Sequence, residues 1–209
     1  MAMTLAQRAG CSALVDLPYF HLAPPLASDR PVLVKAVVTT AYTLAEHKAR
    51  FRPDLTLLAL RDPAAVWCSL SANPYRHRNG SAEEKLALFD RIFAKARDYD
   101  GLLHYEDLIR RPARFLEACA GFGWPLPDTA LELPRKVEAI IADLYATFPE
   151  LPELFDLSFG GFDGGAISAE RTAVPPGDPA RARAAELCPA LSGHYAQYRM
   201  QDEPILASR

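Results

Sequence analysis

The sequence lacks the features that would set it apart from ordinary globular proteins. Its net charge is only −3, from 23 basic and 26 acidic residues, so any anion site must be local and no general nucleic-acid surface is predicted. No run approaches the roughly 18 apolar residues of a membrane span. The N-terminal segment MAMTLAQRAG is too short and too polar for a secretory signal. We therefore expect a soluble, cytoplasmic protein with no nucleic-acid or membrane partner.

Cysteine is scarce and dispersed. The four cysteines form no C-x-x-C pair and accompany no cluster of histidines, so neither a metal site nor a redox pair is predicted. They are Cys11, Cys68, Cys119 and Cys188. A chain of 209 residues can bury about 70% of its unfolded surface and needs no disulfide framework. We expect these thiols to be reduced and partly buried.

The sequence instead alternates short apolar runs with stretches of helical character. Strands are expected at residues 12–16, 32–38, 55–60 and 101–105, and helices at about 40–51, from 63 to the loop at 73–80, and at about 81–98, 112–121, 134–147 and 178–198. Nearly continuous apolar runs such as VLVKAVV are typical of strands buried on both faces of a parallel sheet. We therefore expect an α/β fold with right-handed crossovers. A single domain is expected over 1–209, with its core at about 10–125 and a helical C-terminal part at about 126–209.

Local capping signals mark several helix starts. Thr39 and Thr40 are candidates to cap the helix that follows them. Asp62 and Pro63 are the residue types favoured at an N-cap and at the first helical position. The segment Ser81-Ala82-Glu83-Glu84 has the spacing of a capping box, in which two side chains satisfy two free backbone N–H groups.

Three polar residues are expected near one edge of the sheet. In open parallel sheets, ligands bind beyond the carboxyl ends of the strands. Arg61 leaves the strand at 55–60 at that edge, Lys35 lies within the run 32–38, and Asp16 closes the first strand. A lysine inside an apolar strand is costly unless it emerges at the strand end or meets an anion. The alternative is that Lys35 simply extends into solvent.

Arg61 and Ser69 are spaced to hold one anion. Arg61 stands just before a helix start, where free backbone N–H groups favour anions. Ser69 follows Asp62 by seven residues, about two helical turns, so the two side chains point the same way. A guanidinium and a hydroxyl could then grip one phosphate from two sides. The residues alone leave open an ordinary helix start with an Arg–Asp pair.

Two segments carry a resemblance to a known family. The pattern R-D-P-x-x-V-x-x-S, Arg61 to Ser69, resembles the 3′-phosphate-binding segment of sulfotransferases that use 3′-phosphoadenosine 5′-phosphosulfate (PAPS). The segment LLHYEDLIRRPARFL is similar to the family's Y-E-D-L segment, and VLVK to the strand that carries its lysine. The resemblance covers about residues 10–125. It implies that Arg61 and Ser69 bind the 3′-phosphate, that Tyr105 lies near the nucleotide, and that Lys35 stabilises charge on the bridging oxygen.

The sequence departs from the family at its first motif. The family has a 5′-phosphosulfate loop, a P-(K/R)-S-G-T/S turn between a strand and a helix, which cradles the sulfuryl-bearing phosphate. Gly10 and Gly80 are the only glycines before residue 101, and no such turn occurs. By register, residues 1–8 resemble the tail of the helix that should follow the loop. We expect that the loop lies upstream of Met1, has been cut away, or has been lost together with the activity.

Other family residues are also replaced. Many relatives have a general-base histidine two residues after the lysine, a position held here by Val37. Asp16 is a candidate substitute base by location, and its alternative role is that of a strand-end turn residue. Arg171 is the nearest match to the basic C-terminal segment that helps to bind the 3′-phosphate. The five histidines are scattered along the sequence, and only His77, in a basic loop, is expected near a substrate.

The resemblance implies a three-layer α/β/α parallel sheet of the P-loop nucleoside triphosphate hydrolase/sulfotransferase type, with its first βα unit missing or degenerate. It implies sulfuryl transfer from PAPS, without a metal, to a hydroxyl or amine of a small molecule or sugar. The alternative is a catalytically inactive relative that binds a nucleotide or a protein. An exposed sheet edge at the missing unit would promote homodimer formation. A third alternative, phosphoryl transfer, lacks the G-x-x-x-x-G-K-[ST] motif.

Overall fold

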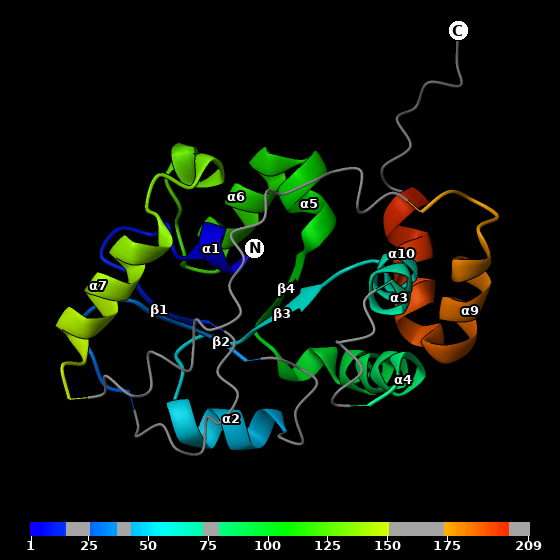
Figure 1. The fold of residues 1–209 in the computed structure, drawn as a ribbon, viewed down its shortest axis with the longest axis horizontal. Coiled ribbons are helices and arrows are strands. Elements are labelled where there is room, and N and C mark those ends of the chain that lie inside the picture. The colour runs from blue at the N-terminus through cyan, green and yellow to red at the C-terminus, as the bar shows by residue number, and fades with distance from the viewer. Residues whose placement is uncertain (16–25, 37–42, 73–79, 151–173, 201–209) are drawn as a thin grey trace, which may run out of the picture. The chain divides into compact units, whose positions relative to one another are not determined.

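The computed structural model describes residues 1–15, 26–36, 43–72, 80–150 and 174–200 (Figure 1). Within these residues the chain is an α/β protein in which helices accompany two small parallel sheets. It divides into two compact units. Unit 1 comprises Met1–Thr56 and Arg111–Ile167, and unit 2 comprises Leu57–Arg110 and Ser168–Arg209. The expectation of a single domain stays a prediction.

Unit 1 is built around a parallel pair of strands, β1 (Ser12–Val15) and β2 (Val32–Lys35). Every residue of β1 is buried, as expected of an apolar strand covered on both faces. The helical elements of unit 1 are α1 (Ala2–Leu5), α2 (Leu44–Phe51), α6 (Pro112–Gly121), η4 (Asp128–Glu132) and α7 (Val137–Thr147). Helix α7 packs against β1, because Leu144 clusters with Leu14 while Ile140 clusters with Ala13 and Val15.

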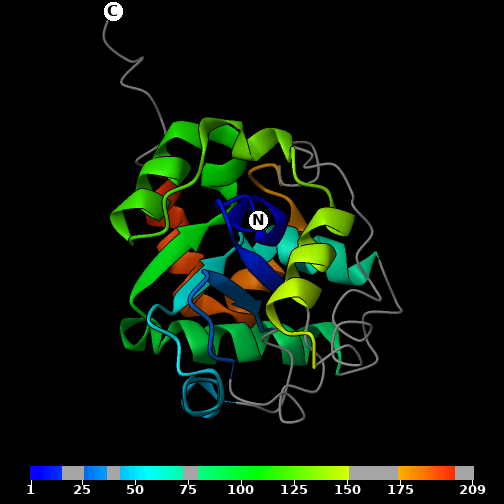
Figure 2. The ribbon, with the colours of Figure 1, turned by 90° about the vertical axis from the view of Figure 1, so that its left-hand side faces the viewer.

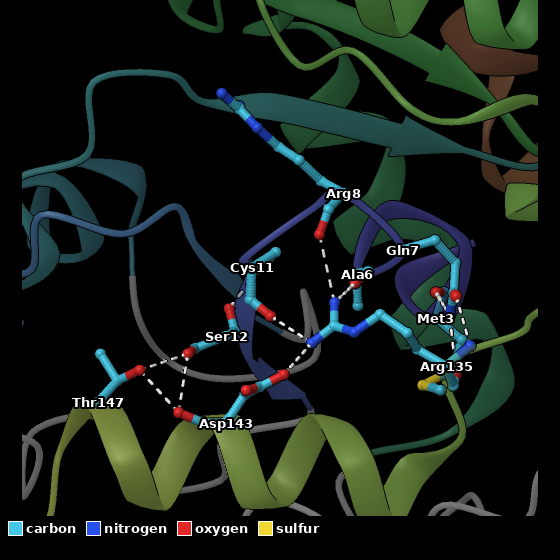
Figure 3. A network of polar contacts seen from close by, with 9 residues as sticks. All are labelled: Met3, Ala6, Gln7, Arg8, Cys11, Ser12, Arg135, Asp143 and Thr147. Atoms are coloured by element: carbon cyan, nitrogen blue, oxygen red, sulfur yellow. Dashed lines mark hydrogen bonds and ion pairs between the residues drawn. The ribbon is translucent and has the colours of Figure 1, made fainter.

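A polar network ties the N-terminal segment of unit 1 to α7 (Figure 3). The guanidinium of Arg135 donates to the backbone carbonyls of Ala6, of Arg8 at 3.2 Å and of Cys11 at 2.8 Å. It also contacts the Oδ2 atom of Asp143 on α7 at 2.6 Å. A single cation thus donates to three backbone carbonyls where α1 leads into β1, one of which, that of Arg8, also accepts the N–H of Cys11 at 3.1 Å.

Unit 2 contains the second parallel pair, β3 (Leu57–Leu60) and β4 (Gly101–His104). Leu60 pairs with His104, so the carboxyl ends of both strands lie at the same edge. The helical elements are α3 (Pro63–Ser71), α4 (Ala82–Phe93), η3 (Ala96–Asp98), α5 (Tyr105–Arg110), α9 (Pro179–Leu187) and α10 (Pro189–Met200). All but η3 are labelled in Figure 1, and Figure 2 shows the ribbon in the same colours after a turn of 90°. One core cluster joins the strands to α3, α4, α9 and α10 through residues such as Leu58, Leu86 and Tyr195.

Several capping predictions are confirmed and one is wrong. Asp62 caps α3 with Pro63 at the first helical position, and Ser81 forms a full capping box with Glu84. Helix α2 begins at Leu44 with Thr43 as its cap, whereas the predicted caps, Thr39 and Thr40, lie outside the described residues. The reason is local, because Thr43 is followed by a glutamate three positions later and completes a reciprocal capping box.

Several predicted elements have different bounds or burial. The strand predicted at 55–60 begins at Leu57, and the helix predicted over about 81–98 ends at Phe93. The last helix is two helices, because Pro189 has no N–H to donate and restricts the residue before it, so α9 ends before Cys188. The predicted strand at 101–105 ends at His104, since Tyr105 already begins α5. Strand β2 is half-buried rather than buried on both faces, and its Lys35 is exposed. Among the described residues, no helix combines the length and apolar character needed to cross a membrane.

Candidate anion-binding site

Arg61 and Tyr105 come together at the carboxyl edge of β3 and β4 in unit 2. Arg61 directly follows β3 and Tyr105 directly follows β4, and the register of the two strands makes these positions neighbours. The Cζ atom of Arg61 lies 5.2 Å from the centroid of the Tyr105 ring, within the range of a cation–π contact. Both residues are half-buried. The aromatic ring therefore helps to position the guanidinium at the edge where parallel sheets bind ligands.

Ser69 is carried by the helix that starts beside Arg61. The Oδ1 atom of Asp62 accepts the backbone N–H of Ala64 at 3.0 Å, which anchors the first turn of α3. Ser69 is half-buried on the same helix. A rise of 1.5 Å per residue puts Ser69 about 10 Å along the axis from Asp62. One phosphate can therefore join Ser69 and Arg61 only if the arginine side chain extends along α3.

The sequence reasoning missed three buried carboxylates at this edge, those of Asp62, Glu106 and Asp107. The backbone N–H of Asp62 donates to Oε1 of Glu106 at 2.9 Å, which links the ends of the two strands directly. The other Glu106 oxygen accepts the hydroxyl of Tyr195 at 2.7 Å. Burial, followed by the nearby Glu106 carboxylate, raises the pKa of Tyr195, so this hydroxyl is a permanent donor. The sequence does contain a signal for these carboxylates, because the segments Arg-Asp and Tyr-Glu-Asp each directly follow an apolar strand, so their acidic residues are expected at the same sheet edge.

Two further arginines reach the same edge from the C-terminal helices. Arg181 and Arg199 both contact Oδ2 of Asp62, at 3.3 Å and 2.7 Å. Arg181 also donates to the backbone carbonyls of Pro175, at 2.9 Å, and Val174. The Arg199 side chain is 39% exposed. In the described part of unit 2, Arg181 and Arg199 thus share the buried carboxylate of Asp62, next to Arg61 in the sequence, so the edge carries charges of both signs rather than a uniformly basic patch.

The structure brings together only part of the predicted site. Arg61, Ser69 and Tyr105 lie in unit 2, whereas Lys35 is the exposed last residue of β2 in unit 1. Lys35 therefore emerges at its strand end, one of the two arrangements expected from the sequence. The other two predicted site residues, Asp16 and Arg171, lie outside the described residues. His77 and Val37 lie outside them as well.

Two of the histidines, which are scattered along the sequence, meet in the structure. The Nε2 atoms of His104 and His194 lie 2.8 Å apart in unit 2. They are 90 residues apart in the sequence, so no local pattern reveals the pair. In the described part of the chain, no group of three or more His, Cys, Asp or Glu side chains is arranged to hold a metal ion.

Glu106→Ala is expected to destabilise unit 2 by about 2–4 kcal/mol, because the N–H of Asp62 and the O–H of Tyr195 would lose their buried acceptor. The matched control is Glu186→Ala. The Glu186 side chain is 67% exposed and makes an ion pair with Arg183, so its loss should cost less than about 1 kcal/mol. Urea unfolding followed by Trp67 fluorescence, in a Trp124→Phe background, measures both. Equal effects of the two substitutions would contradict the buried role of Glu106.

Comparisons of the chain with protein-family models, with curated proteins and with solved structures gave no match.

Proposed function

We propose that the chain is a PAPS-dependent sulfotransferase whose unit 2 binds the 3′-phosphate of the nucleotide through Arg61 and Ser69. In this proposal the chain has the P-loop-type sulfotransferase fold, and the acceptor is a hydroxyl or amine of a small molecule or sugar. Transfer is an in-line displacement, in which the acceptor oxygen or nitrogen forms a bond to sulfur as the bond from sulfur to the phosphate oxygen breaks. The products are the sulfated acceptor, adenosine 3′,5′-bisphosphate and the proton of the acceptor hydroxyl or amine, which a general base takes up.

The observation that carries the proposal is the pairing of Arg61 with Tyr105. The family resemblance rests on two segments, one that begins at Arg61 and one that begins at Leu102 and contains Tyr105. Their key residues lie side by side, with the guanidinium carbon 5.2 Å from the ring centroid. A guanidinium at a strand end, next to a helix start, is suited to bidentate phosphate binding, and an aromatic ring beside it is suited to stacking on a base.

A second candidate function is nucleotide binding without transfer. Val37 stands where many relatives have a histidine. This observation favours an inactive relative, which would keep the Arg61 site and lack the general base for transfer. The role of Lys35 in charge stabilisation stays a prediction. Testing it distinguishes an active sulfotransferase from an inactive relative that only binds the nucleotide. In an active enzyme, Lys35→Ala should abolish transfer and leave binding of the bisphosphate unchanged.

Calorimetric titration with adenosine 3′,5′-bisphosphate tests the proposal. We expect micromolar binding of the bisphosphate, and binding of adenosine 5′-monophosphate that is weaker by about tenfold or more, because it lacks the phosphate assigned to Arg61. ATP, which also lacks a 3′-phosphate, serves as the control for general phosphate affinity. Equal affinity for all three ligands, or no binding of any, would contradict the assignment. Sulfate transfer from labelled PAPS to a panel of acceptors then distinguishes the enzyme from the inactive relative.

A further inference from the structure

Helix α10 presents one polar face to the carboxyl edge of β3 and β4. Residues at positions 194, 195, 198 and 199 share a face of the helix, because 3.6 residues make one turn. We call these four residues the docking face of α10, and each makes one contact with a different residue at or just after the strand ends. The contacts are His194 Nε2 with His104 Nε2 at 2.8 Å, Tyr195 Oη with Glu106 Oε2 at 2.7 Å, Tyr198 Oη with Asp107 Oδ1 at 2.9 Å, and Arg199 Nη1 with Asp62 Oδ2 at 2.7 Å.

The contact between His104 and His194 depends on protonation in a way that the other three do not near neutral pH. Two imidazole nitrogens share a hydrogen bond only when one carries a proton and the other offers a lone pair. Two imidazolium rings present an N–H on every nitrogen, so they can only repel each other at 2.8 Å. The docked arrangement therefore requires at least one neutral histidine.

The surroundings favour His104 as the donor of this hydrogen bond, because burial disfavours a charge on His194. The His104 side chain is only 13% exposed, and its Nδ1 lies 3.8 Å from Oδ2 of Asp107. The ring of Tyr198 stacks on His104 with centroids 4.3 Å apart. A proton on Nε2 of His104 is then donated to Nε2 of His194.

His194 is correspondingly the neutral partner. Phe93 of α4 lies 5.0 Å from its ring centroid, and the ring of Tyr195 meets its edge. Burial lowers the pKa of His194 from its ordinary value of 6.5. The charged groups on the surrounding elements are engaged in contacts of their own. These groups are Asp62, Asp90, Glu106, Asp107, Arg181 and Arg199.

We propose that the pair of His104 and His194 is an acid-sensitive latch that holds α10 on the carboxyl edge of β3 and β4 and releases it when both rings are protonated. Because docking lowers the pKa of His194, the released state binds more protons than the docked state. The contribution of the pair to docking is therefore complete above pH 6.5 and is lost as the pH falls below it. Release would separate Arg199 from Asp62 and Tyr195 from Glu106, and so alter the edge that carries Arg61.

Hydrogen exchange of the intact chain between pH 7.5 and 5.5, corrected for intrinsic exchange rates, tests the latch. We expect protection of the α10 amides to fall by up to about tenfold, because pH 5.5 lies one unit below the ordinary histidine pKa of 6.5. Protection of α7 in unit 1 serves as the internal reference. In His194→Gln, whose amide oxygen can still accept from His104, α10 protection should no longer change over this range. The matched control is His47→Gln on α2, because burial also lowers the pKa of His47, and it should keep the wild-type response of α10.

A response of α10 that persists in His194→Gln would overturn the proposal, as would wild-type protection that is constant over this range. If His194→Gln does not fold, 15N NMR of the histidine rings in the wild-type chain decides. We expect one proton shared between the two Nε2 atoms at pH 7.5, and a second protonation step coupled to loss of α10 protection. Two histidines that titrate independently near 6.5 would equally overturn the latch.

Discussion

Arg61→Ala is expected to weaken binding of adenosine 3′,5′-bisphosphate by about 10- to 100-fold. Hydrogen bonds to charged groups contribute about 1.5–3 kcal/mol each, and every 1.4 kcal/mol is a factor of ten in affinity. Arg61→Lys should recover only part of the loss, because an ammonium keeps the charge but cannot make the bidentate, ring-stacked contact of a guanidinium. Ser69→Ala removes one hydroxyl donor and should cost about tenfold or less.

The control for this series is Arg91→Ala. Arg91 is an exposed arginine on α4 of the same unit, so its loss changes the net charge equally without touching the strand edge. Calorimetry on the four variants, with circular dichroism to verify folding, gives the comparison. If Arg61→Ala and Arg91→Ala both bind like the wild type, Arg61 does not hold the phosphate. If both lose the same affinity, the effect is one of net charge.

Arg135→Ala is expected to destabilise unit 1 by about 2–4 kcal/mol. The substitution removes hydrogen bonds to three backbone carbonyls and the ion pair with Asp143 (Figure 3). Because the Asp143 side chain is 41% exposed, most of the loss should come from the carbonyl groups rather than from the ion pair. Trp124 reports on this unit, since its indole N–H donates to the carbonyl of Leu5 at 3.0 Å in the same N-terminal segment. Urea unfolding of a Trp67→Phe background, followed by fluorescence, measures the change.

Two variants sharpen this test. Lys136→Ala removes the neighbouring exposed cation, which makes no side-chain cap contact with α7, and should change the free energy of unfolding by less than about 0.5 kcal/mol. Arg135→Lys keeps the charge with fewer and less rigid donors, and should lie between the wild type and Arg135→Ala. An Arg135→Ala chain as stable as Lys136→Ala would show that water satisfies the carbonyl groups equally well.

Much of the secondary structure could be predicted because its causes are local. Asp62 and Pro63 start α3 through contacts within two or three residues, and the capping box of Ser81 spans only three. Two helix boundaries were predicted incorrectly, one because a different threonine is the N-cap and one because a proline interrupts the helix. Thr43 caps α2 through a capping box with Glu46, and Pro189 divides one expected helix into two. The half-buried state of β2 depends on packing, which a short apolar run does not reveal.

Of the residues at the candidate site, the sequence identified two that directly follow strands and missed those that come from α10. Arg61 and Tyr105 were found because each directly follows a strand, and the register of β3 with β4 then makes them neighbours. Arg199 and Tyr195 were missed, since they come from a helix whose contacts with Asp62 and Glu106 span 137 and 89 residues. Nothing in the local sequence distinguishes these side chains from ordinary helix residues.

The sequence by itself determined the alternation of strands and helices, the start of α3 beside Arg61, and the apolar faces that build each core. These features depend on interactions between residues within about four positions, or on periodicity, and both are visible along the chain. The tertiary structure alone decided which polar groups meet: Arg135 with three carbonyls, His104 with His194, and the docking face of α10 with the strand ends. Such contacts form where packing brings distant segments together, and the cost of leaving buried polar groups unpaired then selects their partners.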